Sequence, residues 1–313
     1  MKKYILLTIF SAILTFAQNP IPDIDYRESK REEGRDDEGH WVREYYKYNV
    51  KSLRLLETVF DFGMGELELE ANSKRGLIEG NLRYYSDRET PIVDFHKFGS
   101  KGTLIVKSDA LDANHDGRHI ISWGDLRKIK DPDTINNELY FALPKKIDTD
   151  LNLDFGLGEV NIDLDDLSII NMNLDCGLSE VRLELTKPNP VICQFLRIES
   201  GLGEFEGVGL GNLRTLRMDF EIGLGSAEID LRGDFSNDMD VEIDVGLGSL
   251  ELILPRNTNI ELQVNDNFLS SVDISSLQED NGKWVSPDWD SSDPTVTLHI
   301  SVGLGSVEID VRR

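Results

Sequence analysis

Residues 151–164 read Leu-Asn-Leu-Asp-Phe-Gly-Leu-Gly-Glu-Val-Asn-Ile-Asp-Leu, and variants of this stretch recur along most of the chain. Counted from its first glycine, Gly156, apolar residues occupy positions −5, −3 and −1, and after the Gly-Leu-Gly step they occupy +4, +6 and +8. Alternation predicts a strand with one buried face. The change of phase predicts a sharp bend that keeps that face on the same core. Glycine suits such a bend because it tolerates positive φ and close backbone approach.

The Gly-x-Gly corner returns at regular distances. From Gly156 to Gly246 the first glycines follow one another every 21 to 24 residues, which predicts a repeat architecture. A decayed copy with Phe268 in place of the first glycine is expected between Gly246 and Gly303. We expect the following residues at structural corners: Gly63, Gly65, Gly156, Gly158, Gly177 (with Ser179 in the second place), Gly201, Gly203, Gly223, Gly225, Gly246, Gly248, Gly303 and Gly305.

The repeat predicts an all-β fold. A unit of about 22 residues cannot bury its apolar face alone, so neighbouring units must stack. We predict a single-stranded parallel β-helix (β-solenoid) with one coil of about 22 residues per repeat and Gly-x-Gly corners. The alternative is a sandwich in which each motif is an antiparallel hairpin. The β-helix is favoured because the turns lack the Asn-Gly and Asp-Gly pairs of hairpins, and because identical residues recur in identical phase.

The chain divides into four predicted parts. Residues 1–17 combine two lysines with an apolar run too short for a membrane span, which predicts a signal peptide cleaved before Gln18. Residues 18–40 are densely charged and predict a flexible leader. Residues 41–150 predict an N-terminal β-rich cap with irregular coils, and the interval from Gly63 to Gly156 has room for about four coils. Residues 151–313 predict regular repeats with an insertion at 276–294.

Charge and cysteine content restrict the class of partner. The formal net charge is −25, so nucleic acid and anionic lipid are poor partners. No segment after the leader is apolar enough for a membrane helix, and we expect an exported protein, in the periplasm or at the cell surface, without membrane insertion of the mature chain. A disulfide between Cys176 and Cys193 is allowed in such a compartment, but the inward phase of Cys176 favours its use as a small buried hydrophobe.

The sequence offers one candidate metal site. Asp112-Ala113-Asn114-His115-Asp116-Gly117 matches the opening of a calcium loop. Trp123 stands where the closing acid should be, and Asp125 lies two residues further on. The candidate calcium ligands are therefore Asp112, Asn114, Asp116 and Asp125, and the alternative is a polar surface turn. No other cofactor is expected.

Acidic residues form a predicted outward ladder. Position −2 carries Asp or Glu in six copies, and acids continue beyond the bend at +3 and +5. The simpler interpretation is a charged surface that keeps the protein soluble and discourages edge pairing. The functional alternative is a surface for cations or basic ligands. The acids at −2 are Asp61, Asp154, Asp175, Glu199, Glu221 and Asp244.

Nothing in the sequence forms a recognisable catalytic set. The five histidines are scattered without zinc-type spacing, and no Gly-x-Ser-x-Gly motif occurs. We therefore predict that the protein is not an enzyme. A carbohydrate-active enzyme remains as a third alternative, since Trp284 and Trp289 lie together in the late insertion and β-helices host such enzymes.

Two stretches resemble a known family. Gly63-Met64-Gly65-Glu66-Leu67-Glu68-Leu69 and the short strands up to residue 108 resemble the N-terminal part of toast-rack domains. Residues 151–254 resemble their C-terminal part and the related adhesin-like domains of bacterial envelopes. The resemblance implies an envelope protein that acts through protein contacts. We therefore expect an interaction scaffold that binds an unknown envelope protein, with a role in envelope stress. The alternative is a surface adhesin for an unknown ligand.

Overall fold

The computed structural model describes residues 27–36, 39–87, 90–108, 137–265 and 270–312. Within these residues the regular structure is β-strand apart from one short 3-10 turn, η2 (Leu210–Leu213). The all-β prediction is confirmed. No helix in the described part of the chain is long and apolar enough to cross a membrane. The predicted signal peptide, residues 1–17, lies outside the described residues.

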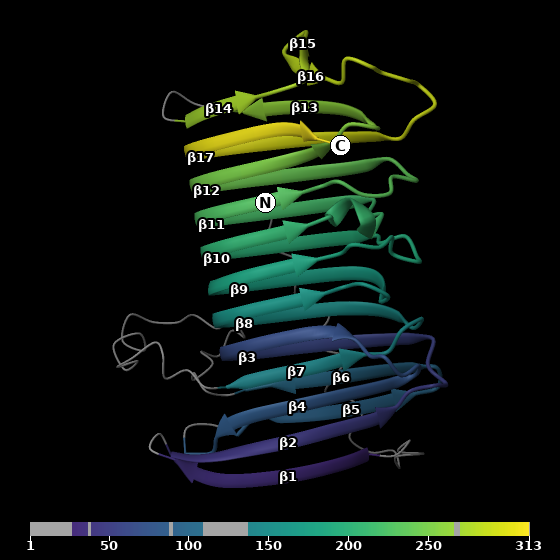
Figure 1. The fold of residues 1–313 in the computed structure, drawn as a ribbon, viewed down its shortest axis with the longest axis vertical. Coiled ribbons are helices and arrows are strands. Elements are labelled where there is room, and N and C mark those ends of the chain that lie inside the picture. The colour runs from purple at the N-terminus through teal and green to yellow at the C-terminus, as the bar shows by residue number, and fades with distance from the viewer. Residues whose placement is uncertain (1–26, 37–38, 88–89, 109–136, 266–269, 313) are drawn as a thin grey trace, which may run out of the picture.

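Seven long strands, each bent at one corner that is Gly-x-Gly in six of them and Gly-Leu-Ser in the seventh, stack side by side (Figure 1). Each consists of one arm before the corner and one after it, and neighbours in the stack pair in parallel with equivalent residues opposite one another. Gly158, for example, is opposite Gly65 on one side and Ser179 on the other. The bent strands are β3 (Leu55–Ala71), β8 (Asp148–Asp163), β9 (Ser168–Glu184), β10 (Phe195–Val208), β11 (Arg217–Asp230), β12 (Met239–Pro255) and β17 (Thr295–Arg312).

The corner glycines explain the phase shift of the apolar residues. The second glycine has positive φ in six of the bent strands, from 133° at Gly158 to 157° at Gly248. After the bend the +4 side chain faces the same interior as the −1 side chain before it. Phe155 at −1 and Val160 at +4 are both buried, and the rings of Phe62 and Phe155 stack with centroids 6.5 Å apart. The expected corner glycines all lie at these bends.

One end of the stack is an antiparallel cap rather than further coils. Gly63 and Gly156 belong to adjacent strands, because β3 pairs directly with β8. The four coils for which the interval has room do not form in the described residues; the chain returns to the other side of β3, where β6 pairs with the first arm and β7 with the second. The remaining cap strands pair antiparallel. The cap consists of β1 (Arg27–Asp36), β2 (Gly39–Asn49), β4 (Leu77–Tyr85), β5 (Ile92–Phe98), β6 (Lys101–Lys107) and β7 (Glu138–Leu143).

The prediction of a flexible leader over residues 18–40 is wrong for β1. This strand pairs along its whole length with β2, from Arg27 opposite Tyr48 to Asp36 opposite Gly39. Its backbone hydrogen bonds need no apolar alternation, and its charged side chains suit an edge strand that must not pair with other chains. Gly34 also leaves room for the ring of Trp41, which a Cβ at that position would contact at 2.5 Å.

At the other end, the order of strands in space differs from their order in sequence. β17 lies between β12 on one side and β13 with β14 on the other. The strands on either side of the decayed copy, which lies between Gly246 and Gly303 in sequence, pair with β17 in the register of a repeat, with Val264 opposite Ile300 and Ser271 opposite Ser306. In space these strands lie beyond the copy at Gly303. The insertion at 276–294 contributes a hairpin that pairs with β13. These strands are β13 (Asn259–Asn265), β14 (Ser270–Ile274), β15 (Gln278–Asp280) and β16 (Lys283–Val285).

Both cysteines lie in the core as free thiols. Cys176 occupies the inward position −1 and is 2% exposed, and Cys193 is fully buried. Burial raises the pKa of the Cys193 thiol to about 11 and that of Cys176 further. Both side chains therefore act as small buried hydrophobes, as the phase of Cys176 predicts.

Candidate interaction surface

The outer face of the arms that follow the corners carries two parallel columns of polar side chains. The column at +3 starts as a run of glutamates in register and continues as a run of serines. Equivalent residues on neighbouring strands lie roughly 4.8 Å apart. In stacking order the column contains Glu66, Glu159, Glu180, Glu204, Ser226, Ser249, Ser306 and Ser271.

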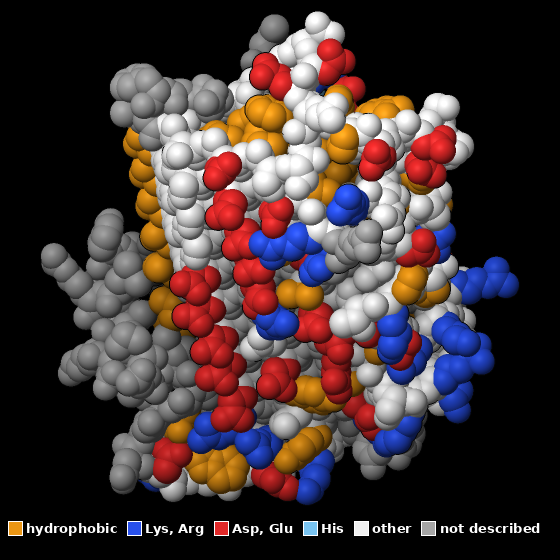
Figure 2. All heavy atoms as spheres, turned by 45° about the horizontal axis from the view of Figure 1, so that its top comes forward, with side chains coloured by type: hydrophobic (Ala, Val, Ile, Leu, Met, Phe, Trp, Pro, Cys, Tyr) orange, Lys and Arg blue, Asp and Glu red, His pale blue; other side chains and the backbone are white. Residues whose placement is uncertain are grey.

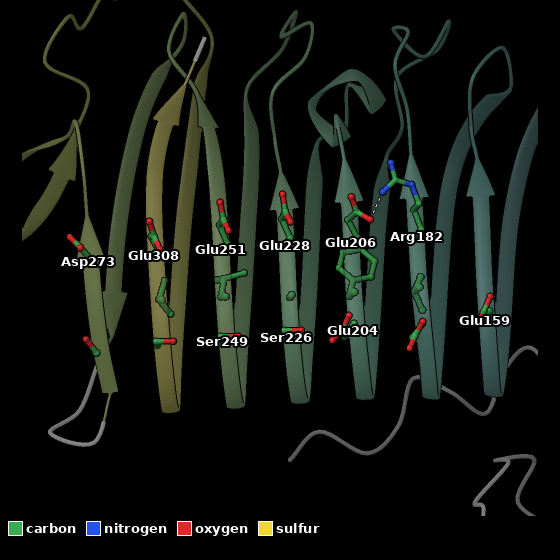
Figure 3. Close-up of a pocket in the computed structure, with 18 of the residues that line it drawn as sticks. Glu159, Arg182, Glu204, Glu206, Ser226, Glu228, Ser249, Glu251, Asp273 and Glu308 are labelled. Atoms are coloured by element: carbon green, nitrogen blue, oxygen red, sulfur yellow. Dashed lines mark ion pairs between the residues drawn. The ribbon is translucent and has the colours of Figure 1, made fainter. Parts of the chain in front are cut away.

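The column at +5 is acidic over the second half of the stack (Figure 3). Arg182 interrupts it and forms ion pairs with Glu206, on the next strand, and with Glu184 at 2.9 Å. These two carboxylates raise the pKa of the Arg182 guanidinium. In stacking order the column contains Glu68, Asn161, Arg182, Glu206, Glu228, Glu251, Glu308 and Asp273.

The two columns border a shallow groove of about 570 Å³ that runs across the strands. Its rims carry carboxylates and serine hydroxyls, and its floor lies over inward residues such as Val181 and Leu250. Figure 2 shows the acidic side chains as columns along this face. A groove of this composition accepts hydrogen-bond donors and positive charge along its length.

In the part of the chain that the structure describes, the glutamates of the +3 column lack compensating cations. Among the described residues, no ion pair is found for Glu66, Glu159, Glu180 or Glu204, although they follow one another in the stack. Desolvation, together with the charges of Glu159, Glu138 and Glu68, raises the pKa of Glu66. Like charges at this spacing favour a bound counter-charge.

Other parts of the predicted ladder are better neutralised than the sequence suggested. At position −2, Arg197 pairs with both Glu199 and Glu221, and Lys107 pairs with Asp61 at 3.2 Å. Beyond the bend, Arg232 and Arg312 contribute ion pairs in addition to those of Arg182. The +3 column therefore keeps an in-register run of four glutamates without an ion pair among the described residues.

The predicted calcium ligands are not placed by the structure. Asp112, Asn114, Asp116 and Asp125 lie outside the described residues, so calcium binding stays a prediction. In the described ranges no group of three or more His, Cys, Asp or Glu side chains is arranged to hold a metal ion. The groove carboxylates form columns rather than such a cluster.

Sequence reasoning also missed a feature of the surface, namely the side chain of the residue between the two corner positions. It is leucine in every regular repeat, and four of these leucines are 40–44% exposed. The signal was present, because a leucine repeated in a phase that faces neither arm's core needs an explanation. The four exposed side chains are Leu202, Leu224, Leu247 and Leu304.

Together, the stack and the groove define a class, the all-β repeat proteins that present a long polar surface on stacked strands. The chain belongs to the toast-rack family, because the family model described as the N-terminal domain of toast_rack, DUF2154, matches residues 37–206. The match spans both the cap and the first repeats, and it confirms the family resemblance.

Solved structures of low sequence identity also resemble the chain. One is described as a "putative cell adhesion protein" from Clostridium sporogenes, with 15% identity, coverage of 92% of this chain and 100% of that one, and a TM-score of 0.43. Another is described as a "putative adhesin" from Bacteroides fragilis, with 14% identity, coverage of 85% and 96%, and a TM-score of 0.36. No curated protein matches the chain.

Proposed function

We propose that this protein is a non-enzymatic, exported scaffold of the bacterial envelope that binds a basic region of another envelope protein in the acidic groove. The observation that carries the proposal is the run of glutamates at +3, whose charges have no cationic partner among the described residues. A partner that brings lysine or arginine side chains would relieve their repulsion and form charge-assisted hydrogen bonds. The fold supports a binding role because its stacked arms present the same outward positions on successive strands.

The proposal includes the coil geometry expected from the sequence. We interpret the stack as a single-stranded parallel β-helix in which one bent strand and one connecting loop form each coil. The support is the in-register parallel pairing of the bent strands. The proposal also includes export by the predicted signal peptide. N-terminal sequencing of the mature protein tests this, and the sequence obtained should begin at Gln18.

Chemical crosslinking in intact envelopes followed by affinity purification tests the scaffold. The wild type should capture a specific partner, and the triple variant Glu159→Gln, Glu180→Gln and Glu204→Gln should lose it. A matched triple variant, Glu279→Gln, Asp280→Asn and Asp288→Asn, removes the same charge from exposed residues of the insertion and leaves the groove intact. Equal capture by all three proteins would contradict the groove as the binding surface.

The second candidate, a surface adhesin, uses the same groove for a ligand outside the cell. The serine half of the +3 column favours it, because Ser226, Ser249 and Ser306 offer a row of exposed or half-exposed hydroxyls to a polar ligand. Protease treatment of whole cells distinguishes the two locations. An adhesin should be cleaved in intact cells, whereas a periplasmic scaffold should be cleaved only after the outer layer is opened.

A further inference from the structure

The exposed corner leucines form a continuous apolar line along one edge of the stack. Leu202, Leu224, Leu247 and Leu304 are opposite one another on successive strands, and each is 40–44% exposed. Leu157 and Leu178 extend the line on the preceding strands with half-buried side chains. We call these six side chains the corner leucine line. Figure 2 shows hydrophobic side chains running along the edge beside the acidic columns.

The bend itself does not require leucine at this position. The strain and the close contacts of the corner fall on the two glycines, whereas the intervening side chain points toward solvent. The same structure keeps most of its other outward positions polar, including −2 and +3 on either side of the leucine. A leucine in the same place on every regular repeat, exposed in four of the six, is therefore a feature of the surface. Exposed apolar patches bordered by polar residues mark interaction sites.

Spacing favours a helix as the occupant. The leucines repeat at roughly 4.8 Å, the distance between paired strands. An α-helix lying along the stack presents apolar side chains once per turn, about every 5.4 Å, whereas an extended strand presents them about every 6.6 Å on one face. The six leucines span about 24 Å, which corresponds to a helix of about 16 residues.

Charge selects a basic helix. Carboxylates border the line at −2 from Asp154 to Asp244, where Arg197 pairs with Glu199 and Glu221. At +3, Glu159, Glu180 and Glu204 border the first three leucines of the line, and serines border the last three. A second copy of this chain would bring acidic columns against acidic columns, and an anionic membrane would be repelled in the same way. Lysine or arginine side chains flanking an apolar stripe would instead meet carboxylates on both sides over the first half of the line, and carboxylates at −2 together with serine hydroxyls at +3 over the second half.

We propose that the corner leucine line docks a basic amphipathic helix of a partner protein. This inference rests on the proposed scaffold function and specifies the secondary structure and the chemistry of the partner. The apolar face of the helix packs on the leucines, and its basic flanks face the −2 and +3 columns. The groove and the leucine line are adjacent, so one partner can contact both.

A model peptide tests the docking directly. The probe is an 18-residue, fluorescein-labelled peptide of leucine and lysine, with the leucines in helical phase, and fluorescence anisotropy is measured at physiological salt. The wild type should bind it, and the variant with Leu202→Ser, Leu224→Ser and Leu247→Ser should bind at least about tenfold more weakly. A peptide of the same composition with the helical phase scrambled should bind the wild type more weakly.

The chain offers a matched control away from the corners. Leu216 and Ile192 have the same exposure as the corner leucines, 40% and 42%, and lie at the opposite end of the repeat. The variant Leu216→Ser with Ile192→Ser should bind the peptide as the wild type does. Because the substituted side chains are exposed, all variants should fold. Thermal melting of each variant checks this.

The alternatives give different results. Equal binding by the wild type and the corner variant, or equal binding of both peptides, would overturn the proposal. So would self-association in sedimentation, or cosedimentation with phosphatidylcholine vesicles, if either were lost in the corner variant. If the scaffold function fails, envelope crosslinking captures nothing with the wild type. If only the docking inference fails, the corner variant still captures the native partner.

Discussion

At the scale of single residues, the second corner glycine meets two separate restrictions. Gly225 has a φ of 143°, a conformation that other L-residues rarely adopt. In addition, a Cβ at Gly225 would overlap the carbonyl oxygen of Gly203 on the preceding strand. Ser179 shows how the restriction is avoided, since it occupies the same position without positive φ, although its buried hydroxyl has no hydrogen-bond partner among the described residues. The glycine is therefore required by both the backbone and the neighbouring strand.

Replacing Gly225 by alanine should destabilise the protein strongly. We expect Gly225→Ala to lower the free energy of unfolding by about 3 kcal/mol or more, because backbone strain adds to a clash with backbone atoms. Chemical denaturation measures the change. Gly282→Ala is the control: Gly282 has a φ of 80°, but no heavy atom lies within 4 Å of the added Cβ, so the cost should be about 1 kcal/mol. Equal costs would show that the clash contributes nothing.

Because the pKa of Glu66 is raised, its contribution to folding stability depends on pH. Its pKa is raised by desolvation and by the neighbouring carboxylates, so the folded state holds the proton up to a higher pH than the unfolded state does. Stability therefore falls as pH rises from the unfolded pKa through the folded one, and the loss is complete above the folded value. Glu66→Gln should raise the melting temperature at pH 7 and leave it almost unchanged at pH 3, where both states are protonated.

Melting curves at low ionic strength check the effect of Glu66. Added NaCl should reduce the gain at pH 7, because salt screens the repulsion between exposed carboxylates. Glu279→Gln removes one negative charge in the hairpin, away from the column, and should change the melting temperature less. A gain that is independent of pH would mean that the column does not destabilise the folded state.

At the scale of elements, the regular strands were predictable, whereas the antiparallel pairing within the cap was not. The repeated alternation around Gly156 and Gly223 specifies a bent strand from local sequence alone, and identical phases specify parallel stacking. β1 carries no such signal, because a charged edge strand is held by backbone pairing with β2. The position of β17 between β12 and β13 is equally hidden, since every regular copy has the same pairing surface and only the connections decide which copies meet.

The candidate site was predictable to a similar extent. The outward phase of Glu159, Glu180 and Glu204 follows from alternation, so the acidic column could be expected. The uncompensated charge of the groove could not be predicted, because it depends on which neighbouring side chains form ion pairs with which carboxylates, as Arg182 does with Glu206. The exposure of the corner leucines also depends on the direction of the bend, which the sequence pattern alone does not give.

The hairpin of β15 and β16 protects an otherwise open edge. β13 pairs with β17 on one side, and Trp284 and Val285 of β16 pair with its other side. The hairpin turns at Asn281 and Gly282, whose φ values of 53° and 80° suit a two-residue turn of the Asn-Gly type. Open strand edges pair with other chains, so the hairpin acts against aggregation.

Replacing residues 277–285 by a glycine-serine linker of equal length should cause self-association. The linker leaves the edge of β13 unpaired, and we expect oligomers that grow with protein concentration in size-exclusion chromatography with light scattering. Trp284→Ala is the control, because it removes the large side chain and retains the strand, and it should stay monomeric. A linker variant that is monomeric at high concentration would assign the hairpin no protective role.

At the scale of the whole molecule, the stack behaves as a linear array. Each bent strand pairs with its immediate neighbours, as β9 does with β8 and β10, so stability is the sum of contributions from neighbouring pairs. The antiparallel cap closes one end and the hairpin closes the other (Figure 1). Central strands have two partners along both arms, and their opening requires the loss of both interfaces.

Native-state hydrogen exchange should reveal this order, with β17 as the decisive strand. Exchange should be slowest in β9, β10 and β11 and faster in β1 and in the hairpin, because local opening follows the number of interfaces that must be lost. β17 is the last strand described in the chain, and a strand in that position would ordinarily fray.

Its place in the stack reverses this expectation. β17 pairs with β12 along both arms and with β13 and β14 on its other side, so its opening requires the loss of both interfaces, as for the central strands. Mass spectrometry of peptides from 295–312 should therefore show protection close to that of 239–255 and greater than that of 259–265. If the 295–312 peptides exchange as fast as those of the hairpin, β17 is not held between its two neighbours in solution, and the stack must end at β12.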